Sequence, residues 1–251
     1  MSPIGSDTVL LTFLLFCRIG GCLMFMSGYS SARVPVQIRL LLAIAVTLAL
    51  TPLLLPPLAK EVALLSPELG FQLLVSEVMT GSMIGLMGRM FFLALDFMGV
   101  AIASFTGFSN LPGIALENAE PNPTLSALIT LTATVIFFAG DLHWEVLRGL
   151  VISYQVLPVT GGYAAQSGLI QFSDALSAAF ALAVQISAPF IIYSIAINLL
   201  FGIMNKLTPQ IAVYFISLPF VVFGGLFVLY FTIGEFLKIF ISGFSRWLIS
   251  G

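Results

Sequence analysis

The residues that could carry out chemistry are few in this chain, and their spacing favours no catalytic site. A serine hydrolase needs a serine nucleophile within reach of a histidine base. The one histidine is His143, and Ser109, in the run Gly107-Phe108-Ser109, is the only candidate nucleophile for it. Ser109 lies where the sequence predicts a loop. An intramembrane serine protease is therefore not favoured, and we expect a protein that is not an enzyme.

The cysteines and the histidine predict neither a disulfide nor a metal site. Cys17 and Cys22 are five residues apart in an apolar stretch, and on a helix their side chains point about 140° apart. They therefore cannot bridge each other. With a single histidine in the chain, the Cys/His ligand set of a zinc site is not available. We interpret both thiols as small packing residues and expect neither a metal nor a cofactor.

The informative polar residues are charges that interrupt apolar stretches, namely Arg18, Glu77, Arg89 and Asp96. A charge at the centre of a bilayer costs roughly 2.5–3.5 kcal/mol on insertion scales. We therefore expect these side chains to face protein, water or a zone outside the hydrocarbon. Arg89 and Asp96 are about 10.5 Å apart along a helix, so each needs a partner elsewhere. Buried pairing between helices and a direct part in transport are both compatible with the pattern.

Small residues follow Glu77 on one helix face. At 100° per residue, Glu77, Gly81, Gly85 and Gly88 fall within an arc of about 80°. Gly81 and Gly85 form a GxxxG pattern, which allows close approach of helix backbones in lipid. We expect another helix, from this chain or another one, to cover this face.

A second polar face lies near the end of the chain. Asn198, Gly202 and Asn205 share one side of a long apolar helix. Amides inside hydrocarbon need hydrogen-bond partners. The face therefore predicts either a contact between helices or subunits, or a pore lining.

The elements that carry these residues are predicted to be membrane helices. Of 251 residues, 59% are hydrophobic and 8% are charged, against roughly 25% charged in soluble domains. About 20 apolar residues are enough to span a bilayer. Five stretches of at least that length contain no Asp, Glu, Lys or Arg: 40–59, 97–116, 121–140, 175–205 and 207–234. The sequence therefore predicts an integral membrane protein.

The charge distribution excludes two further classes. The net charge is −2, and the charges are too scattered to form a basic surface for nucleic acid. Residues 1–8 carry Asp7 but no Lys or Arg, so they lack the positive flank of a secretory signal peptide. We expect the first hydrophobic segment to be retained.

Hydrophobic runs and helix breakers give a helix map. Pro56-Pro57 is expected to close the second helix, and residues 141–145 are expected to interrupt the fourth. The predicted helices cover about 8–27, 36–55, 68–104, 124–139, 146–156, 174–205 and 209–241. The fold class is an all-α, single-domain membrane protein with about six hydrophobic helices, some broken or kinked.

A family resemblance rests first on the hairpin between the last two helices. Asn198 is followed four residues later by Gly202, four later again by Lys206, and then by Pro209-Gln210. This run resembles the signature hairpin of the FliR/SctT family.

Other segments resemble that family in the same order along nearly the whole chain. They are Phe16-Cys17-Arg18, Val34-Pro35 with Arg39, the glycine face with Asp96 and Gly99, and His143 followed by Ser153 and Pro158-Val159-Thr160-Gly161. Two positions depart from the family pattern, namely Asn122 before Pro123 and Ala212 after Ile211. They put individual polar contacts in doubt, but not membership.

The resemblance implies a core subunit of the flagellar type III export gate in the bacterial inner membrane, at the flagellar basal body. It implies a helical hetero-oligomer with FliP-like and FliQ-like subunits, an FlhB-like subunit on the cytoplasmic side, and unfolded flagellar proteins in transit. It also implies a FliP-like portion, 1–173, and a FliQ-like hairpin, 174–251. An injectisome subunit of the SctT type is the alternative within the family. A small-solute transporter is the alternative outside it, although no inverted repeat supports one.

The resemblance also suggests three groups of functional residues. A plug in the closed channel would include Phe105, Phe108, Leu111, Pro112 and Ile114. A hairpin directed toward the cytoplasm would include Lys206, Pro209 and Gln210. Contacts between subunits would involve Glu77, Gly81, Gly85, Gly88, Arg89, Asp96, Asn198, Gly202 and Asn205.

Overall fold

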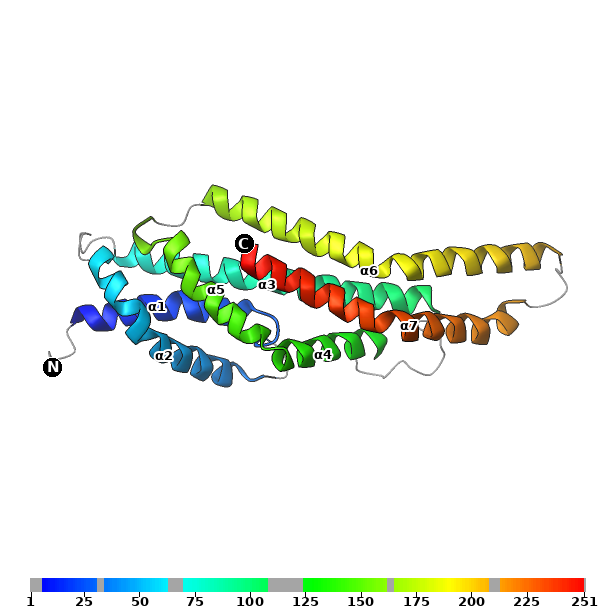
Figure 1. The fold of residues 1–251 in the computed structure, drawn as a ribbon, viewed down its shortest axis with the longest axis horizontal. Helices are drawn as coiled ribbons and strands as arrows, with labels where there is room; N and C mark the ends of the chain where they lie inside the picture. Colours follow the sequence, from blue (N-terminus) through cyan, green and yellow to red (C-terminus); the bar gives the residue numbers. More distant parts are fainter. Residues whose placement is uncertain are drawn as a thin grey trace. The chain divides into compact units, whose positions relative to one another are not determined.

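The computed structural model describes residues 6–30, 34–62, 70–107, 124–161, 165–207 and 213–250. Within these ranges the chain forms helices and turns and contains no strand, which confirms the predicted all-α class. The helices (Figure 1) are α1 (Ser6–Phe25), α2 (Val36–Val62), α3 (Gly70–Phe105), α4 (Thr124–Ala139), α5 (Leu142–Val156), the short 3-10 helix η3 (Val159–Gly161), α6 (Ala165–Leu207) and α7 (Val213–Ser250).

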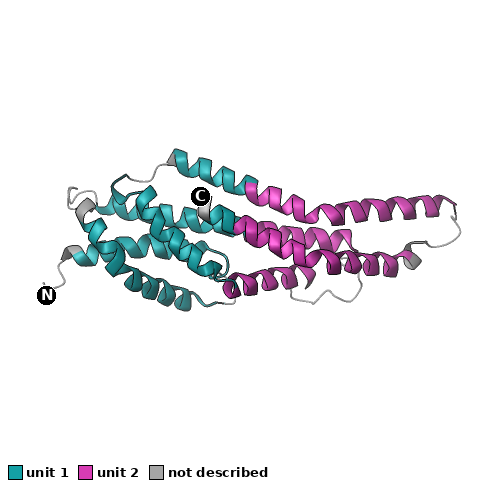
Figure 2. Ribbon diagram, viewed as in Figure 1, with its two compact units in different colours: residues 1–91, 140–177, 245–251 teal, residues 92–139, 178–244 magenta. Residues whose placement is uncertain are grey.

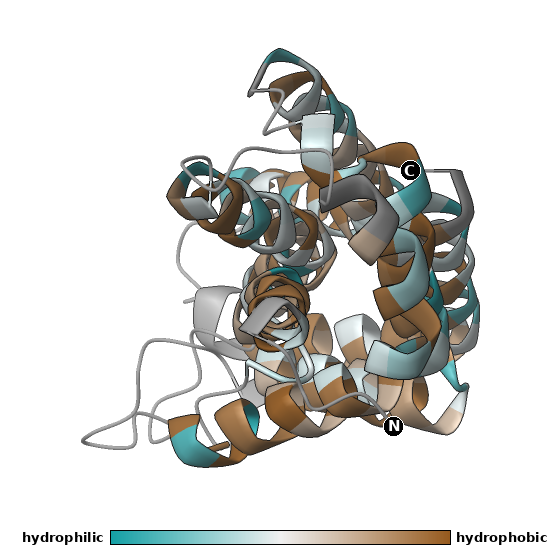
Figure 3. Ribbon diagram, turned by 90° about the vertical axis from the view of Figure 1, so that its left-hand side faces the viewer, coloured by the Kyte–Doolittle hydropathy of each residue, from teal (hydrophilic) through white to brown (hydrophobic). Residues whose placement is uncertain are grey.

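The helices have the length and apolar surface of membrane helices. Five of them, α1, α2, α3, α6 and α7, are long and apolar enough to cross a bilayer, and α4 with α5 makes a sixth candidate if the pair is one broken span. Hydrophobic residues occur along all the helices (Figure 3), and many of the large ones are exposed. An apolar surface on all sides is typical of helices that lie in lipid or against other apolar helices.

Several predicted helix boundaries are wrong. α6 begins at Ala165 and not near residue 174, and α7 continues to Ser250 and not only to residue 241. Pro56 and Pro57 do not end α2, which continues to Val62 with three prolines inside it. In Figure 1 the helix bends in its second half instead. A proline removes one backbone hydrogen bond and kinks a helix, but an apolar surrounding offers the backbone no partner other than the helix itself. The expected interruption at 141–145 is also shorter, because α5 begins at Leu142.

The chain divides into two compact units (Figure 2). The first contains residues 1–91, 140–177 and 245–251, and the second contains residues 92–139 and 178–244. In the first unit, α1 packs its fully buried Leu14, Leu15 and Ile19 into a core that α2 and η3 complete.

The second unit has an aromatic core. The rings of Phe92 in α3 and Phe137 in α4 are 5.8 Å apart, and the rings of Phe92 and Phe240 in α7 are 5.4 Å apart, both edge to face. This is the arrangement that aromatic quadrupoles favour. In addition, Tyr193 Oη of α6 donates to the carbonyl of Val221 in α7 at 2.7 Å. Gly224 makes room for that phenol, because a Cβ there would overlap the Tyr193 hydroxyl.

The glycine face of α3 contacts α1 of the same chain. A Cβ on Gly81 would lie 2.8 Å from Cα of Arg18, and a Cβ on Gly85 would lie 3.1 Å from Cα of Cys22. Gly21 faces back from α1, where an added Cβ would lie 3.1 Å from the backbone of Ser82. The two backbones are therefore in direct contact, as a GxxxG pattern allows.

We expect Gly81→Ala to destabilise the protein, because the added methyl group would force α1 away from α3. Overpacking of this kind costs about 1–3 kcal/mol. Thermal unfolding in detergent, followed by circular dichroism, measures the change. Gly149→Ala is the matched control, since an added Cβ there meets no atom within 4 Å. Equal midpoints for the two variants would contradict the α1–α3 contact.

Candidate functional site

A buried ion pair lies at the centre of the first unit. Arg18 of α1 donates from Nε to Glu77 Oε2 at 2.7 Å and from Nη2 to Glu77 Oε1 at 2.6 Å. The two side chains are 1% and 0% exposed. This bidentate geometry is the strongest arrangement available to a guanidinium and a carboxylate. Arg18 and Glu77, two of the four charges that interrupt apolar helices, are therefore each other's counter-charge.

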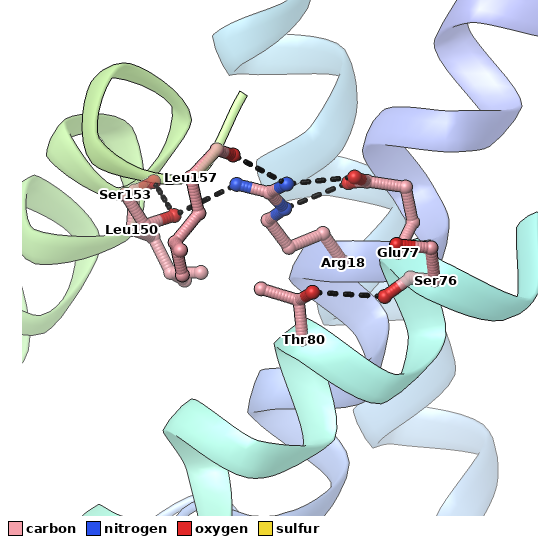
Figure 4. A network of polar contacts seen from close by, with 7 residues as sticks. All are labelled: Arg18, Ser76, Glu77, Thr80, Leu150, Ser153 and Leu157. Carbon is pink, nitrogen blue, oxygen red and sulfur yellow. Dashed lines mark hydrogen bonds and ion pairs between the residues drawn. The ribbon is translucent and has the colours of Figure 1, made fainter. Parts of the chain in front are cut away.

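The same guanidinium holds the end of α5 (Figure 4). Its Nη1 donates to Ser153 Oγ at 3.3 Å, and its Nη2 also donates to the carbonyl of Leu157 at 3.0 Å. Leu157 is the C-cap residue of α5, and a cation at a helix C-terminus satisfies free carbonyls and opposes the helix dipole. The guanidinium also lies 4.1 Å from the centre of the Tyr154 ring, which adds a cation–π contact. Arg18 thus joins α1, α3 and α5.

A second polar cluster lies in the other unit, around Asp96 of α3. Ser126 Oγ of α4 lies 2.5 Å from Asp96 Oδ1 and 3.1 Å from the Asp96 carbonyl oxygen. Thr130 Oγ1 is 3.5 Å from the same carboxyl oxygen. Gly99 permits this approach, since a Cβ there would lie 2.7 Å from Cα of Ser126. The Asp96 carboxylate therefore accepts hydrogen bonds from hydroxyl groups of α4.

The remaining predicted residues are placed as follows. Arg89 is half-buried and forms no ion pair with any other residue that the structure describes. Asn198, Gly202 and Asn205 are exposed on α6. The Asn198 amide donates only within its own helix, to the carbonyl and hydroxyl of Ser194. The face around Gly202 is open, since a Cβ there meets nothing within 4 Å.

The predicted plug and hairpin fall largely outside the described residues. Phe105 is the last residue of α3, and Gly107 follows it with φ +76, a left-handed conformation that ends the helix. Phe108, Leu111, Pro112 and Ile114 are outside the described ranges. So are Pro209 and Gln210, whereas Lys206 is exposed in the last turn of α6.

Neither alternative chemistry gains support from the geometry. His143 is half-buried in α5, with its ring 5.6 Å from that of Trp144. Its candidate partner Ser109 lies outside the described ranges. The described part of the chain also has no group of three or more His, Cys, Asp or Glu side chains that could hold a metal ion.

The sequence did not reveal the α5 half of the Arg18 cluster. In the sequence, Ser153 stands out only through the family resemblance. The carbonyl of Leu157 has no sequence signal, since a backbone acceptor is present at every residue. Tyr154 could have been suspected, because an aromatic ring next to a buried guanidinium is a common pairing. That suspicion would have required knowing that α5 packs on α1.

We expect Glu77→Gln to destabilise the protein strongly, since it leaves the Arg18 guanidinium buried without a counter-charge. Breaking a buried pair costs about 3–5 kcal/mol. The control is Glu235→Gln, because Glu235 and its partner Lys238 are 69% and 74% exposed and such surface pairs contribute little. Unfolding midpoints in detergent compare the two. A Glu77→Gln protein as stable as the control would show that the pair does not hold the helices.

The described residues thus form a helical membrane protein in which Arg18 joins three helices. Comparison with known proteins identifies its family. The model of the family described as bacterial export proteins, family 1, matches residues 9–247. The chain is 27% identical to the flagellar biosynthetic protein FliR of Caulobacter vibrioides, with 86% of this chain and 85% of that protein covered. It is 29% identical to FliR of Aquifex aeolicus (91% and 88% covered) and 25% identical to FliR of Escherichia coli (76% and 71% covered). The chain therefore belongs to the bacterial export proteins of family 1.

Proposed function

We propose that this protein is the FliR-type core subunit of the flagellar type III export gate, a multi-pass protein of the inner membrane at the flagellar base. The observation that carries the proposal is the family match over residues 9–247, joined to five or six helices that can span a membrane. The relatives found all bear the name of the flagellar protein, which favours the flagellar system over an injectisome. The protein acts as part of a channel wall and not as a catalyst.

The uncovered helices support an assembly with sister subunits. In the most apolar stretch of α3, 50% of the residues are buried, against 17% in α6 and 11% in α7. Large side chains such as Phe223 and Tyr230 are 72% and 77% exposed on α7. We assign these faces to contacts with FliP-like and FliQ-like subunits, and the segment after Lys206 to a contact with an FlhB-like subunit.

Asn198, Gly202 and Asn205 are the sharpest candidates for one such contact. They place two amide side chains, with a glycine between them, on a helix face that no described residue of this chain covers. In the proposed assembly a neighbouring helix approaches at Gly202 and completes the hydrogen bonds of the amides. The glycines of α3 have a different role in this proposal, because α1 already occupies their face.

We expect Gly202→Leu to fold normally and to lose its partners. The added side chain meets nothing in this chain, but it fills the space that a neighbouring helix would use. Co-purification with FliP- and FliQ-type subunits of the same bacterium, together with swimming motility, measures the loss. Gly149→Leu serves as the control, since its surroundings within the chain are equally open. Full partner recovery with Gly202→Leu would remove this face from the assembly.

The segment after Phe105 is proposed to seal the closed channel. α3 ends there at a left-handed glycine, and the sequence up to Asn122 combines glycine and proline with apolar side chains. Apolar constrictions exclude water and ions from a pore. The seal would yield to an arriving unfolded chain.

Deletion of residues 109–116 tests the seal. We expect the assembled gate that carries the deletion to leak ions, because the apolar constriction would be lost. Conductance of the complex in planar bilayers measures the leak. A shuffled segment of the same eight residues controls for loop length. A deleted gate as tight as the parent would exclude the plug role.

A further inference from the structure

Within the second unit, a side chain of α6 contacts the backbone inside α7. Tyr193 of α6 donates from Oη to the carbonyl oxygen of Val221 at 2.7 Å. In a regular helix that carbonyl accepts from the N–H four residues later, which is that of Gly225. The Gly225 N–H is also a donor to the Tyr193 hydroxyl. The phenol therefore reaches both groups of one backbone hydrogen bond of α7.

Adjacent glycines, Gly224 and Gly225, leave the α7 backbone open at this point. A Cβ on Gly224 would overlap the Tyr193 hydroxyl and lie 3.1 Å from Cζ of its ring. Pairs of small residues, and side chains that reach into the ladder of backbone hydrogen bonds, are causes of helix bends. In Figure 1 both α6 and α7 change direction part-way along, and each contains a proline, Pro189 and Pro219. The Tyr193 contact therefore falls on a segment of α7 whose residues favour bending.

The end of α3 packs against the same turn of α7. A Cβ on Gly225 would lie 2.6 Å from Cγ2 and 3.0 Å from Cα of Thr106. A Cβ on Gly107, the next residue, would lie 3.2 Å from Cγ1 of Val221. All these residues belong to the second unit. One turn of α7 is therefore contacted by a hydroxyl group of α6 and by the last turn of α3.

Large side chains on both sides of this turn contribute little packing within the chain. Phe220, Phe223 and Phe227 are all exposed, so a change in the direction of α7 would separate few contacts of these rings. The Tyr193 hydrogen bond and the packed end of α3 therefore have a large share in fixing the backbone at this turn.

We propose that residues 221–225 form a joint in α7, that the Tyr193 hydroxyl fixes its angle, and that the end of α3 moves with it. Glycine has more backbone freedom than any other residue, so the two glycines allow the two halves of α7 to take more than one angle. While Tyr193 holds the Val221 carbonyl, one angle is kept. When the hydroxyl leaves that carbonyl, the angle changes, and the contact of Thr106 with Gly225 transmits the change to α3. The joint is a property of this chain and does not depend on the proposed export function.

Distances between spin labels on α7 test the joint in the full chain. Labels are attached at Phe220→Cys and Ser242→Cys, on the two sides of the joint, in a Cys17→Ala/Cys22→Ala background. A reference pair, Phe227→Cys with Ser242→Cys, lies on one side of it. At 1.5 Å per residue the two pairs are roughly 33 Å and roughly 22 Å apart, separations that pulsed electron–electron double resonance measures.

Tyr193→Phe removes the hydroxyl and keeps the ring. We expect it to broaden the distance distribution of the pair that spans the joint and to leave the reference pair unchanged, because only the angle between the two halves is released. Tyr230→Phe is the matched control, since that ring is 77% exposed on the same helix. A spanning distribution as narrow as in the parent protein would overturn the role of the hydroxyl. Equal broadening of both pairs would overturn the joint, because the whole helix would then have lost order.

Gly225→Ala tests the link to α3 separately. The added methyl group would meet Thr106, so we expect it to shift the mean distance of the spanning pair. Gly234→Ala is the control on the same helix, because a Cβ there meets nothing within 4 Å, and it is expected to leave the mean unchanged. The same mean distance in Gly225→Ala and in the parent protein would overturn the coupling between the joint and the end of α3.

Discussion

A charge that is cut off from water must find its counter-charge within the protein, and the first unit of this structure is organised around that requirement. Arg18 and Glu77 are both buried and form two short hydrogen bonds with each other. The remaining donors of the guanidinium reach α5. Three helices separated widely in the sequence thus meet at one cation. Any rearrangement that separated them would expose an unpaired charge to an apolar surrounding.

The charged groups of the two polar clusters have different kinds of hydrogen-bond partner. Arg18 is matched by a carboxylate, whereas the carboxyl group of Asp96 is matched by the hydroxyl groups of Ser126 and Thr130. In both places a glycine of α3 allows the partner helix to come close enough, Gly81 in the first case and Gly99 in the second. On α3, small residues thus accompany the buried Glu77 and the half-buried Asp96, because close contact between helix backbones brings the hydrogen-bond partners of these carboxylates within reach.

The sequence predicted correctly the features that depend on neighbouring residues, such as helix positions and the residues that share a helix face. It predicted α4 at the residues where it is found, and it placed Glu77 and three glycines on one covered face. It could not tell which helix covers that face, because nothing local marks a partner about 60 residues away. The prediction that prolines end α2 was wrong. A proline that would end a helix in water only bends one in an apolar surrounding, where the backbone finds no other hydrogen-bond partner. The exposed Asn198 amide donates within its own helix, and nothing local in the sequence says what else meets this face of α6.

The contact between Gly81, Gly85 and α1 has a mechanical consequence. No side chain separates the two backbones there, so a slide of α3 by one residue would drive the side chain of a neighbour such as Thr80 or Ser82 into the main chain of α1. The register of this helix pair is therefore locked. Any movement of this part of the protein therefore carries α1 and the segment of α3 around Gly81 and Gly85 together, as a single body.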